Sequence, residues 1–322
     1  MMRNLLSILL SIISFQQYNL IYCSSHNNEQ KECFKNDNEI LELEYLNKTV
    51  FILDNKYSLI KLDSNWIVEK KVSLRTNSKM IPKPIRLLAI KNKLYLFWMN
   101  GDVEIFDQKI NLIKKIKISP QPASVTLITN KIYTLSWEFD NDYYLTEYDT
   151  DLKNPKKILI HKKRSEWPYA DQFTFDFDPS SNQIVFLYKF INKIELRDRN
   201  FKLLDSLKVV GIKDTADYEV YSIFDEMLNY TKNNFLNYRN TLGISRVPKE
   251  YLHAIVNFKY PHLLISNNIV DETKEYINKI NISNNILISI QIKGSRILFM
   301  QNNIIFTLNR DKKVIYKCKL SI

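Results

Sequence analysis

Short runs of alternating apolar and polar residues follow one another along most of the chain, from Glu39 onward. The runs are rich in Ile, Val, Tyr and Phe, and segments of Asn, Asp and Lys separate them. Alternation with β-branched and aromatic residues predicts half-buried β-strands. Almost none of this region has the apolar period of an amphipathic helix. The pattern therefore predicts an all-β protein.

The predicted strands recur in groups of four. In the clearest group, Ile85–Ile90 precedes Lys93–Trp98, a turn at Asn100-Gly101-Asp102 leads into Val103–Phe106, and Asn111–Ile118 follows. Asn-Gly between alternating runs is a strong hairpin signal. The same order of an apolar stretch and three further strands recurs over 40–74, 124–161, 173–209 and 286–320.

Four antiparallel strands repeating every ~40–50 residues are typical of a β-propeller blade. Between 211 and 283 the repeat is less regular: Tyr218–Phe224, Tyr251–Phe258 and Tyr276–Ile282 are predicted strands, and Asp225–Arg239 is a predicted short helix. We therefore expect one β-propeller domain over 39–322, with six or seven four-stranded antiparallel blades. A two-sheet sandwich is the alternative, but about 280 residues is long for one.

The N-terminus has the features of an export signal. Met1-Met2-Arg3 is followed by the uncharged apolar run Leu5–Phe15, which is shorter than a membrane-spanning helix. We expect residues 1–25 to be a cleaved signal. Leu20–Cys23 has the outline of a bacterial lipobox with Cys23 as the lipidated residue, although Tyr22 departs from it, and ordinary cleavage near Cys23 fits equally well. Residues 26–38 are a predicted polar tether.

Export makes the three cysteines, Cys23, Cys33 and Cys318, candidates for pairing. Cys33 precedes the first predicted strand and Cys318 lies in the last one. A propeller brings these strands together to close its ring, so a Cys33–Cys318 disulfide would staple the closure. Two unrelated thiols are the alternative. The four histidines and three cysteines match no zinc-binding spacing.

Composition narrows the function classes. The chain has 322 residues and a formal net charge of +11, but only four glycines. A Rossmann fingerprint or a P-loop would use two or three of them, so no nucleotide cofactor is expected. Export argues against nucleic acid as the partner of the positive charge. Contact with a membrane is expected only through a lipid anchor.

One group of strands resembles a known family. Phe177–Tyr188, Lys193–Asp198 and Phe201–Leu207 are similar to a blade of the TolB-like six-bladed β-propellers of bacteria. The resemblance implies an exported protein, in many cases a lipoprotein. The family has no shared catalytic motif, so it implies no site residues. A glycine usually stands in the turn that Arg199-Asn200 occupies here.

Two segments carry candidate site residues. The loop after the third group is basic and aromatic, with Lys162, Lys163, Arg164, Trp167 and Tyr169, and it suits an acidic glycan, a phosphate or an acidic protein tail. Asp171, Asp176 and Asp178 offer oxygen ligands for Ca²⁺, but alternation with phenylalanines and the Asp-Pro step make a strand and turn the simpler interpretation. We therefore predict no metal or other cofactor.

These features favour an exported, envelope-associated β-propeller, located in the periplasm, on the cell envelope or outside the cell. We expect it to bind protein or glycan without chemistry. The alternative is a propeller hydrolase or lyase that acts on an extracellular sugar or lactone through channel carboxylates, with or without Ca²⁺. No Gly-x-Ser-x-Gly nucleophile elbow is present.

Overall fold

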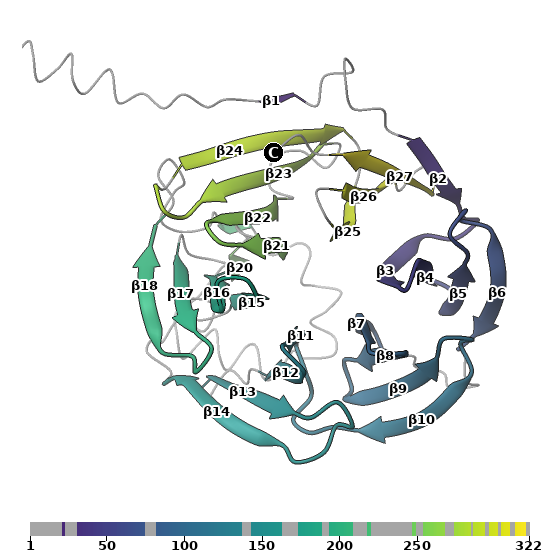
Figure 1. Cartoon of the computed structure of the whole chain (residues 1–322), viewed down its shortest axis with the longest axis horizontal. Coiled ribbons are helices and arrows are strands. Elements are labelled where there is room, and N and C mark those ends of the chain that lie inside the picture. The colour runs from purple at the N-terminus through teal and green to yellow at the C-terminus, as the bar shows by residue number, and fades with distance from the viewer. Residues whose placement is uncertain are drawn as a thin grey trace, which may run out of the picture.

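The computed structural model contains only strands among its described elements (Figure 1). It describes residues 21–22, 31–74, 82–136, 143–162, 173–188, 193–208, 218–219, 247–248, 254–267, 274–284, 286–293, 296–301, 304–309 and 313–319. The strands form a ring of radial sheets around a common centre. The predicted all-β propeller is confirmed.

The ring has six blades of four strands each. Blade 1 contains β3 (Ile40–Leu46), β4 (Thr49–Asp54), β5 (Ser58–Leu62) and β6 (Val68–Ser73). Blade 2 contains β7 (Pro84–Ile90), β8 (Lys93–Trp98), β9 (Asp102–Asp107) and β10 (Leu112–Lys117). Blade 3 contains β11 (Ser124–Ile128), β12 (Lys131–Ser136), β13 (Tyr143–Tyr148) and β14 (Lys156–His161).

Blade 4 contains β15 (Phe173–Asp178), β16 (Gln183–Tyr188), β17 (Ile194–Asp198) and β18 (Leu203–Leu207). Blade 5 contains β21 (Ala254–Lys259), β22 (His262–Asn267), β23 (Lys274–Asn281) and β24 (Ile286–Lys293). Between blades 4 and 5, β19 (Tyr218–Glu219) pairs with β20 (Val247–Pro248). The predicted helix at 225–239 lies outside the described residues.

Blade 6 is built from both ends of the chain. Its inner strands are β25 (Arg296–Gln301), β26 (Ile304–Asn309) and β27 (Val314–Lys319), and its outermost strand is β2 (Lys31–Lys35). The Asn36 N–H also donates to the Lys313 carbonyl at 3.0 Å. Blade 6 therefore joins the two ends of the chain in one sheet, and this pairing closes the ring.

Two sequence-based assignments near this closure are wrong. We expected 286–292 to be the first strand of the last blade, but β24 is the outer strand of blade 5. The apolar runs on either side of this blade boundary look alike, so the alternation does not show where one blade ends. The expected tether at 26–38 also contains β2, because the last blade needs a fourth strand.

Both cysteines proposed for a disulfide lie at this closure. Cys33 is in β2 beside a register shift, between the residues that pair with Tyr316 and Ile315. Cys318 is in the neighbouring strand β27 and pairs with Ile305 on the other side. The backbone register thus offsets the two cysteines along adjacent strands. The disulfide stays a prediction.

Neighbouring blades pack through apolar clusters. The second strand of each of the first four blades is buried on both of its faces: Val50 and Ile52 of β4 pack toward blade 6, while Phe51 and Leu53 pack toward blade 2. Similar clusters join blade 2 to 3, 3 to 4 and 4 to 5. Because both faces are buried, these strands are almost continuously apolar.

Blades 1 to 4 share one turn between their third and fourth strands. It has five residues, begins with Asp and carries a large apolar residue at its fourth position: 63–67, 107–111, 149–153 and 198–202. The Asp carboxylate accepts the backbone N–H groups of the third and fifth residues, as Asp107 does from Lys109 and Asn111, at 2.8 Å each. The Asp side chain therefore fixes the turn.

The fourth residue of this turn joins two blades. Trp66, Ile110, Leu152 and Phe201 have φ between 51° and 66°, a left-handed conformation that usually favours glycine. Each of them packs in the cluster shared with the preceding blade. The burial of a large side chain offsets the backbone strain of about 1–2 kcal/mol.

Substitutions at Ile110 separate these two effects. Ile110→Ala keeps the left-handed strain and loses the buried side chain, so we expect a loss of about 2–5 kcal/mol in the free energy of unfolding. Ile110→Gly loses the same side chain but relieves the strain, and we expect it to be about 1 kcal/mol more stable than Ile110→Ala. Urea unfolding followed by fluorescence measures both. Exposed Leu112→Ala is the control, and an alanine variant more stable than the glycine variant would contradict the explanation.

Candidate functional site

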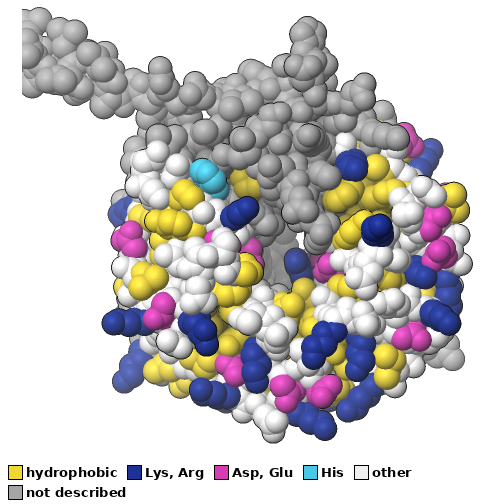
Figure 2. Space-filling view, viewed as in Figure 1, with side chains coloured by type: hydrophobic (Ala, Val, Ile, Leu, Met, Phe, Trp, Pro, Cys, Tyr) yellow, Lys and Arg dark blue, Asp and Glu magenta, His cyan; other side chains and the backbone are white. Residues whose placement is uncertain are grey.

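Among the side chains that the structure describes, three polar ones occupy equivalent positions on the inner strands, which surround the central hollow (Figure 2). Glu44 of β3, Thr126 of β11 and Asp176 of β15 each lie opposite the third residue of the neighbouring strand, which is Phe51, Tyr133 and Val185 respectively. The repeat therefore places them at one level of the channel, on blades 1, 3 and 4. Leu88 holds this position in blade 2.

These three side chains bond to the backbone of the next blade. The carboxylate of Glu44 accepts the N–H of Tyr45 at 3.0 Å and the N–H of Ala89 in β7. The Thr126 hydroxyl donates to the Phe175 carbonyl at 3.1 Å. An inner strand has one edge without a partner in its own sheet, and these side chains satisfy backbone groups along that edge.

Asp176 makes the same kind of link. Its carboxylate accepts the N–H of Phe177 at 2.9 Å and the N–H of Phe258 in β21. The blade 4 to blade 5 junction is thus sealed at the channel by a carboxylate, as the blade 1 to blade 2 junction is by Glu44.

Both carboxyl groups have raised pKa values. Burial raises the pKa of Glu44 from 4.5 to about 7, and the positive charge of Arg86 and the backbone hydrogen bonds only partly oppose the shift. Burial likewise raises the pKa of Asp176 from 3.8 to about 6, again against Arg86 and backbone hydrogen bonds. Both carboxyl groups therefore titrate closer to neutral pH than an exposed carboxyl does.

Arg86 is the positive group between these two carboxyls. It lies on β7 opposite Phe97, two residues before Leu88, and its side chain is exposed. Its charge acts on Glu44 from the neighbouring blade and on Asp176 from two blades away. In the space-filling view, Lys or Arg and Asp or Glu side chains are visible beside the central hollow (Figure 2). Glu44, Arg86 and Asp176 are hereafter called the channel triad.

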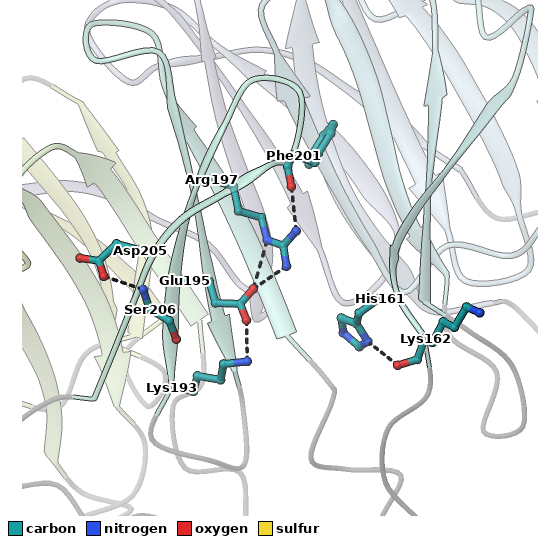
Figure 3. A network of polar contacts seen from close by, with 8 residues as sticks. All are labelled: His161, Lys162, Lys193, Glu195, Arg197, Phe201, Asp205 and Ser206. Atoms are coloured by element: carbon teal, nitrogen blue, oxygen red, sulfur yellow. Dashed lines mark hydrogen bonds and ion pairs between the residues drawn. The ribbon is translucent and has the colours of Figure 1, made fainter.

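A second charged cluster lies inside blade 4 (Figure 3). Glu195 accepts hydrogen bonds from Arg197, the shorter at 2.7 Å, and forms an ion pair with Lys193 at 2.5 Å. Another Arg197 nitrogen donates to the Phe201 carbonyl at 2.7 Å. Burial opposes ionisation of Glu195, but Lys193 and Arg197 outweigh it and lower the pKa. Because its charges satisfy one another and the turn, this cluster is structural.

The predicted basic loop is only partly described. Lys162 is exposed just after β14, and its carbonyl lies 3.4 Å from Nδ1 of the buried His161 (Figure 3). Lys163, Arg164, Trp167 and Tyr169 lie outside the described residues. The loop as a ligand site stays a prediction, and the channel triad does not include it.

The acidic segment divides into two roles. Asp176 belongs to the channel triad, whereas Asp178 accepts hydrogen bonds from Ser180, Ser181 and the Tyr260 N–H. These bonds fix the Asp-Pro turn and tie blade 4 to blade 5. Asp171 lies outside the described residues. Among the residues that the structure does describe, no group of three or more His, Cys, Asp or Glu side chains is arranged to hold a metal ion.

Sequence reasoning found Asp176 but missed Glu44 and Arg86. A signal was present, because Glu44 and Arg86 interrupt the apolar runs 40–46 and 84–90, which are inner strands. A charged residue on an inner strand of a propeller must face a neighbouring blade or the channel. That inference requires knowing which strand of each blade is the innermost one. The alternation of apolar and polar residues alone does not show this.

Comparison with solved structures finds the same architecture in proteins of low sequence identity. A member of the DUF4221 family from Bacteroides vulgatus superposes with a TM-score of 0.54 at 11% identity and covers 90% of this chain and 93% of that chain. A streptogramin B lyase superposes with a TM-score of 0.52 at 13% identity, covering 91% and 97%. What they share with this chain is the propeller fold.

Sequence comparison adds little to this. No protein-family profile matches the chain. A mitochondrial 15S rRNA processing factor, CCM1 of Kluyveromyces lactis, is 25% identical over 144 residues, which is 38% of this chain and 16% of that protein. The chain thus spans about a sixth of that relative's length. Among the described residues, no helix is long and apolar enough to cross a bilayer.

The raised pKa of Glu44 predicts a pH-dependent stability. Because its folded-state pKa lies above 4.5, the folded state favours the protonated acid, and its ionisation costs stability. We expect the free energy of unfolding to fall by about 3 kcal/mol more in the wild-type chain than in Glu44→Gln as pH rises from 4.5 to 7.

Urea unfolding at several pH values measures this difference. Glutamine can still accept the two backbone N–H groups, so the variant removes the titration and keeps the link between the blades. Glu32→Gln, at an exposed position of β2, is the matched control and should keep the wild-type slope. A Glu44→Gln variant with the wild-type slope would contradict the assignment.

Proposed function

We propose that this chain is an exported, envelope-associated β-propeller that binds a protein or glycan ligand without chemistry, at its central channel. The apolar run Leu5–Phe15 and the small-residue segment after it support export. The resemblance of blade 4 to TolB-like propellers supports the same class of protein. The periplasm, the cell envelope and the medium all fit this proposal, with or without a lipid on Cys23.

The channel triad is the observation that carries the proposal. Three blades place one guanidinium and two carboxyls on the inner strands around the hollow, and the Arg86 charge acts on both carboxyls. A propeller holds such groups on rigid strands. Glu44 and Asp176 already accept backbone N–H groups, whereas Arg86 is exposed and donates no hydrogen bond to another described residue. Its guanidinium can therefore donate to a ligand. A guanidinium flanked by carboxyls offers both donors and acceptors.

That combination fits the hydroxyl groups of a glycan. A hydroxyl donates one hydrogen bond and accepts others, so neighbouring sugar hydroxyls can bridge Arg86 and a carboxyl oxygen. An acidic sugar would in addition pair with the guanidinium. The glycan is therefore the ligand class that we favour, and a protein segment with Ser, Thr or acidic side chains is the other.

Arg86→Ala tests the site. We expect purified full-length protein to bind at least one class of oligosaccharide on a glycan array. Arg86→Ala should weaken that binding at least tenfold, because it removes the exposed donor of the triad. Titration calorimetry with the best oligosaccharide gives the affinities. Lys114→Ala, on the outer strand β10, keeps the same charge change away from the channel and should stay within twofold of wild type.

Equal affinities for wild-type protein and Arg86→Ala would show that the ligand site lies outside the channel. Loss of binding in Lys114→Ala as well would assign the binding to general positive charge. Circular dichroism of each variant shows that the β-sheet content is retained.

One observation favours the enzymatic alternative. A carboxyl with a pKa of about 7, as Glu44 has, or about 6, as Asp176 has, can act as a general acid or base near neutral pH. A hydrolase or lyase acting on a sugar or lactone would use such groups. Their hydrogen bonds to backbone N–H groups favour a structural role instead.

Turnover assays separate the two functions. Under the binding proposal, full-length protein should not raise the rate of opening of γ-lactones or cleavage of 4-nitrophenyl glycosides above the buffer rate. Turnover that falls at least 100-fold in both Glu44→Gln and Asp176→Asn, with a rate profile that bends between pH 6 and 7, would establish the enzyme instead.

A further inference from the structure

Most outer strands of the ring carry protection against pairing with another strand. An outer strand presents one backbone edge to its surroundings, and lysines, bulges and short length are the usual means of blocking it. β6, β10 and β14 contain two or three lysines each, and β18 has only five residues. The pairings of β6, β10, β14, β18 and β2 with their neighbours each contain a register shift.

β24 is neither short nor bulged, and its single lysine stands at its last position. It is eight residues long and pairs with β23 through eight successive residues without a register shift. Its sequence, ILISIQIK, has isoleucine at every second position from Ile286 to Ile292, and its one charged residue is Lys293 at the end. A long and regular edge whose only charge lies at its end is a template for a further strand.

A strand already lies on this edge. β1 (Ile21–Tyr22) runs parallel to β24, with Ile21 opposite Ile290 and Tyr22 opposite Gln291 (Figure 1). Among the described residues, β1 pairs with two of the eight positions of β24. The predicted cleavage near Cys23 would also remove β1 and free the whole edge.

We propose that the outer edge of β24 is a docking site for an extended segment of a partner protein, which runs parallel to β24 and takes the place of β1. The partner segment supplies backbone hydrogen bonds along the edge and apolar or aromatic side chains like those of Ile21 and Tyr22. The same fold already completes blade 6 by adding a distant strand, β2, to the edge of β27.

The direction of β1 favours a partner over a second copy. Two copies related by twofold symmetry join identical edge strands in antiparallel orientation. The segment seated on β24 is parallel, which a heterologous strand provides and a symmetric dimer does not. This site lies on the perimeter of the ring and is independent of the channel triad.

The test uses the full-length chain and a peptide probe. The probe is a fluorescent peptide with residues 17–25 of this chain and serine in place of Cys23. Fluorescence anisotropy should show at least fivefold tighter binding to Ile21→Pro than to wild-type protein, because the proline removes an N–H of the tethered segment that competes for the edge.

A second substitution locates the binding. Ser289→Lys with Gln291→Lys, added to Ile21→Pro, gives β24 the lysines that other outer strands have and should weaken peptide binding at least tenfold. Ser206→Lys on β18 is the matched control and should change it less than twofold. Peptide should also slow amide hydrogen exchange in β24. Arg86→Ala should leave peptide binding unchanged, so that failure here and failure of the proposed channel function can be distinguished.

Two results would overturn the proposal. If the lysines on β24 leave peptide binding unchanged, the peptide binds at a site other than β24. A concentration-dependent dimer of Ile21→Pro, seen by light scattering and lost with the lysines, would make a second copy the occupant. If circular dichroism shows that the double lysine variant does not fold, Gln291→Lys alone serves for both measurements.

Discussion

Blades 1 to 4 each have two apolar faces, and the fold depends on burying both. The second strands show the constraint most directly: Val50, Phe51, Ile52 and Leu53 are successive residues that alternate between two neighbouring blades and are all at most 1% exposed. A sheet with two apolar faces is stable only between two other sheets. The chain must therefore close on itself, and β2 provides the closure by pairing with β27.

Closure creates a second constraint at the centre. The inner strands turn an edge toward the channel, and the backbone groups there need partners. Glu44, Thr126 and Asp176 supply them from equivalent positions of three blades. Two of the residues that complete these backbone hydrogen bonds, Glu44 and Asp176, thus place carboxyl groups on the inner strands around the hollow. These side chains therefore both stabilise the fold and belong to the candidate site. In our proposal, Arg86 is the group that binds the ligand.

The sequence predicted strands correctly where turn residues clearly separated one apolar run from the next. Thr49–Asp54, Lys93–Trp98, Tyr143–Tyr148 and Gln183–Tyr188 match β4, β8, β13 and β16 at both ends. It failed where neighbouring runs look alike: β22 was not anticipated, and β24 was assigned to the wrong blade. Alternation reports that a segment is a strand, but the sheet to which it belongs is decided by contacts between distant residues. The channel triad was hidden for the same reason, since Glu44 and Asp176 are far apart in the chain.

The way blade 6 is assembled also sets an order for folding. Strands of blades 1 to 5 pair with neighbours that lie close in the chain, so each of these sheets can form as soon as its own residues emerge from the ribosome or from a translocation channel. β2 must instead wait for β27, because Phe34 pairs with Ile315 near the opposite end of the chain. Until then blade 6 lacks its outermost strand. The ring is thus a structure whose last contact to form is made by one of its first residues.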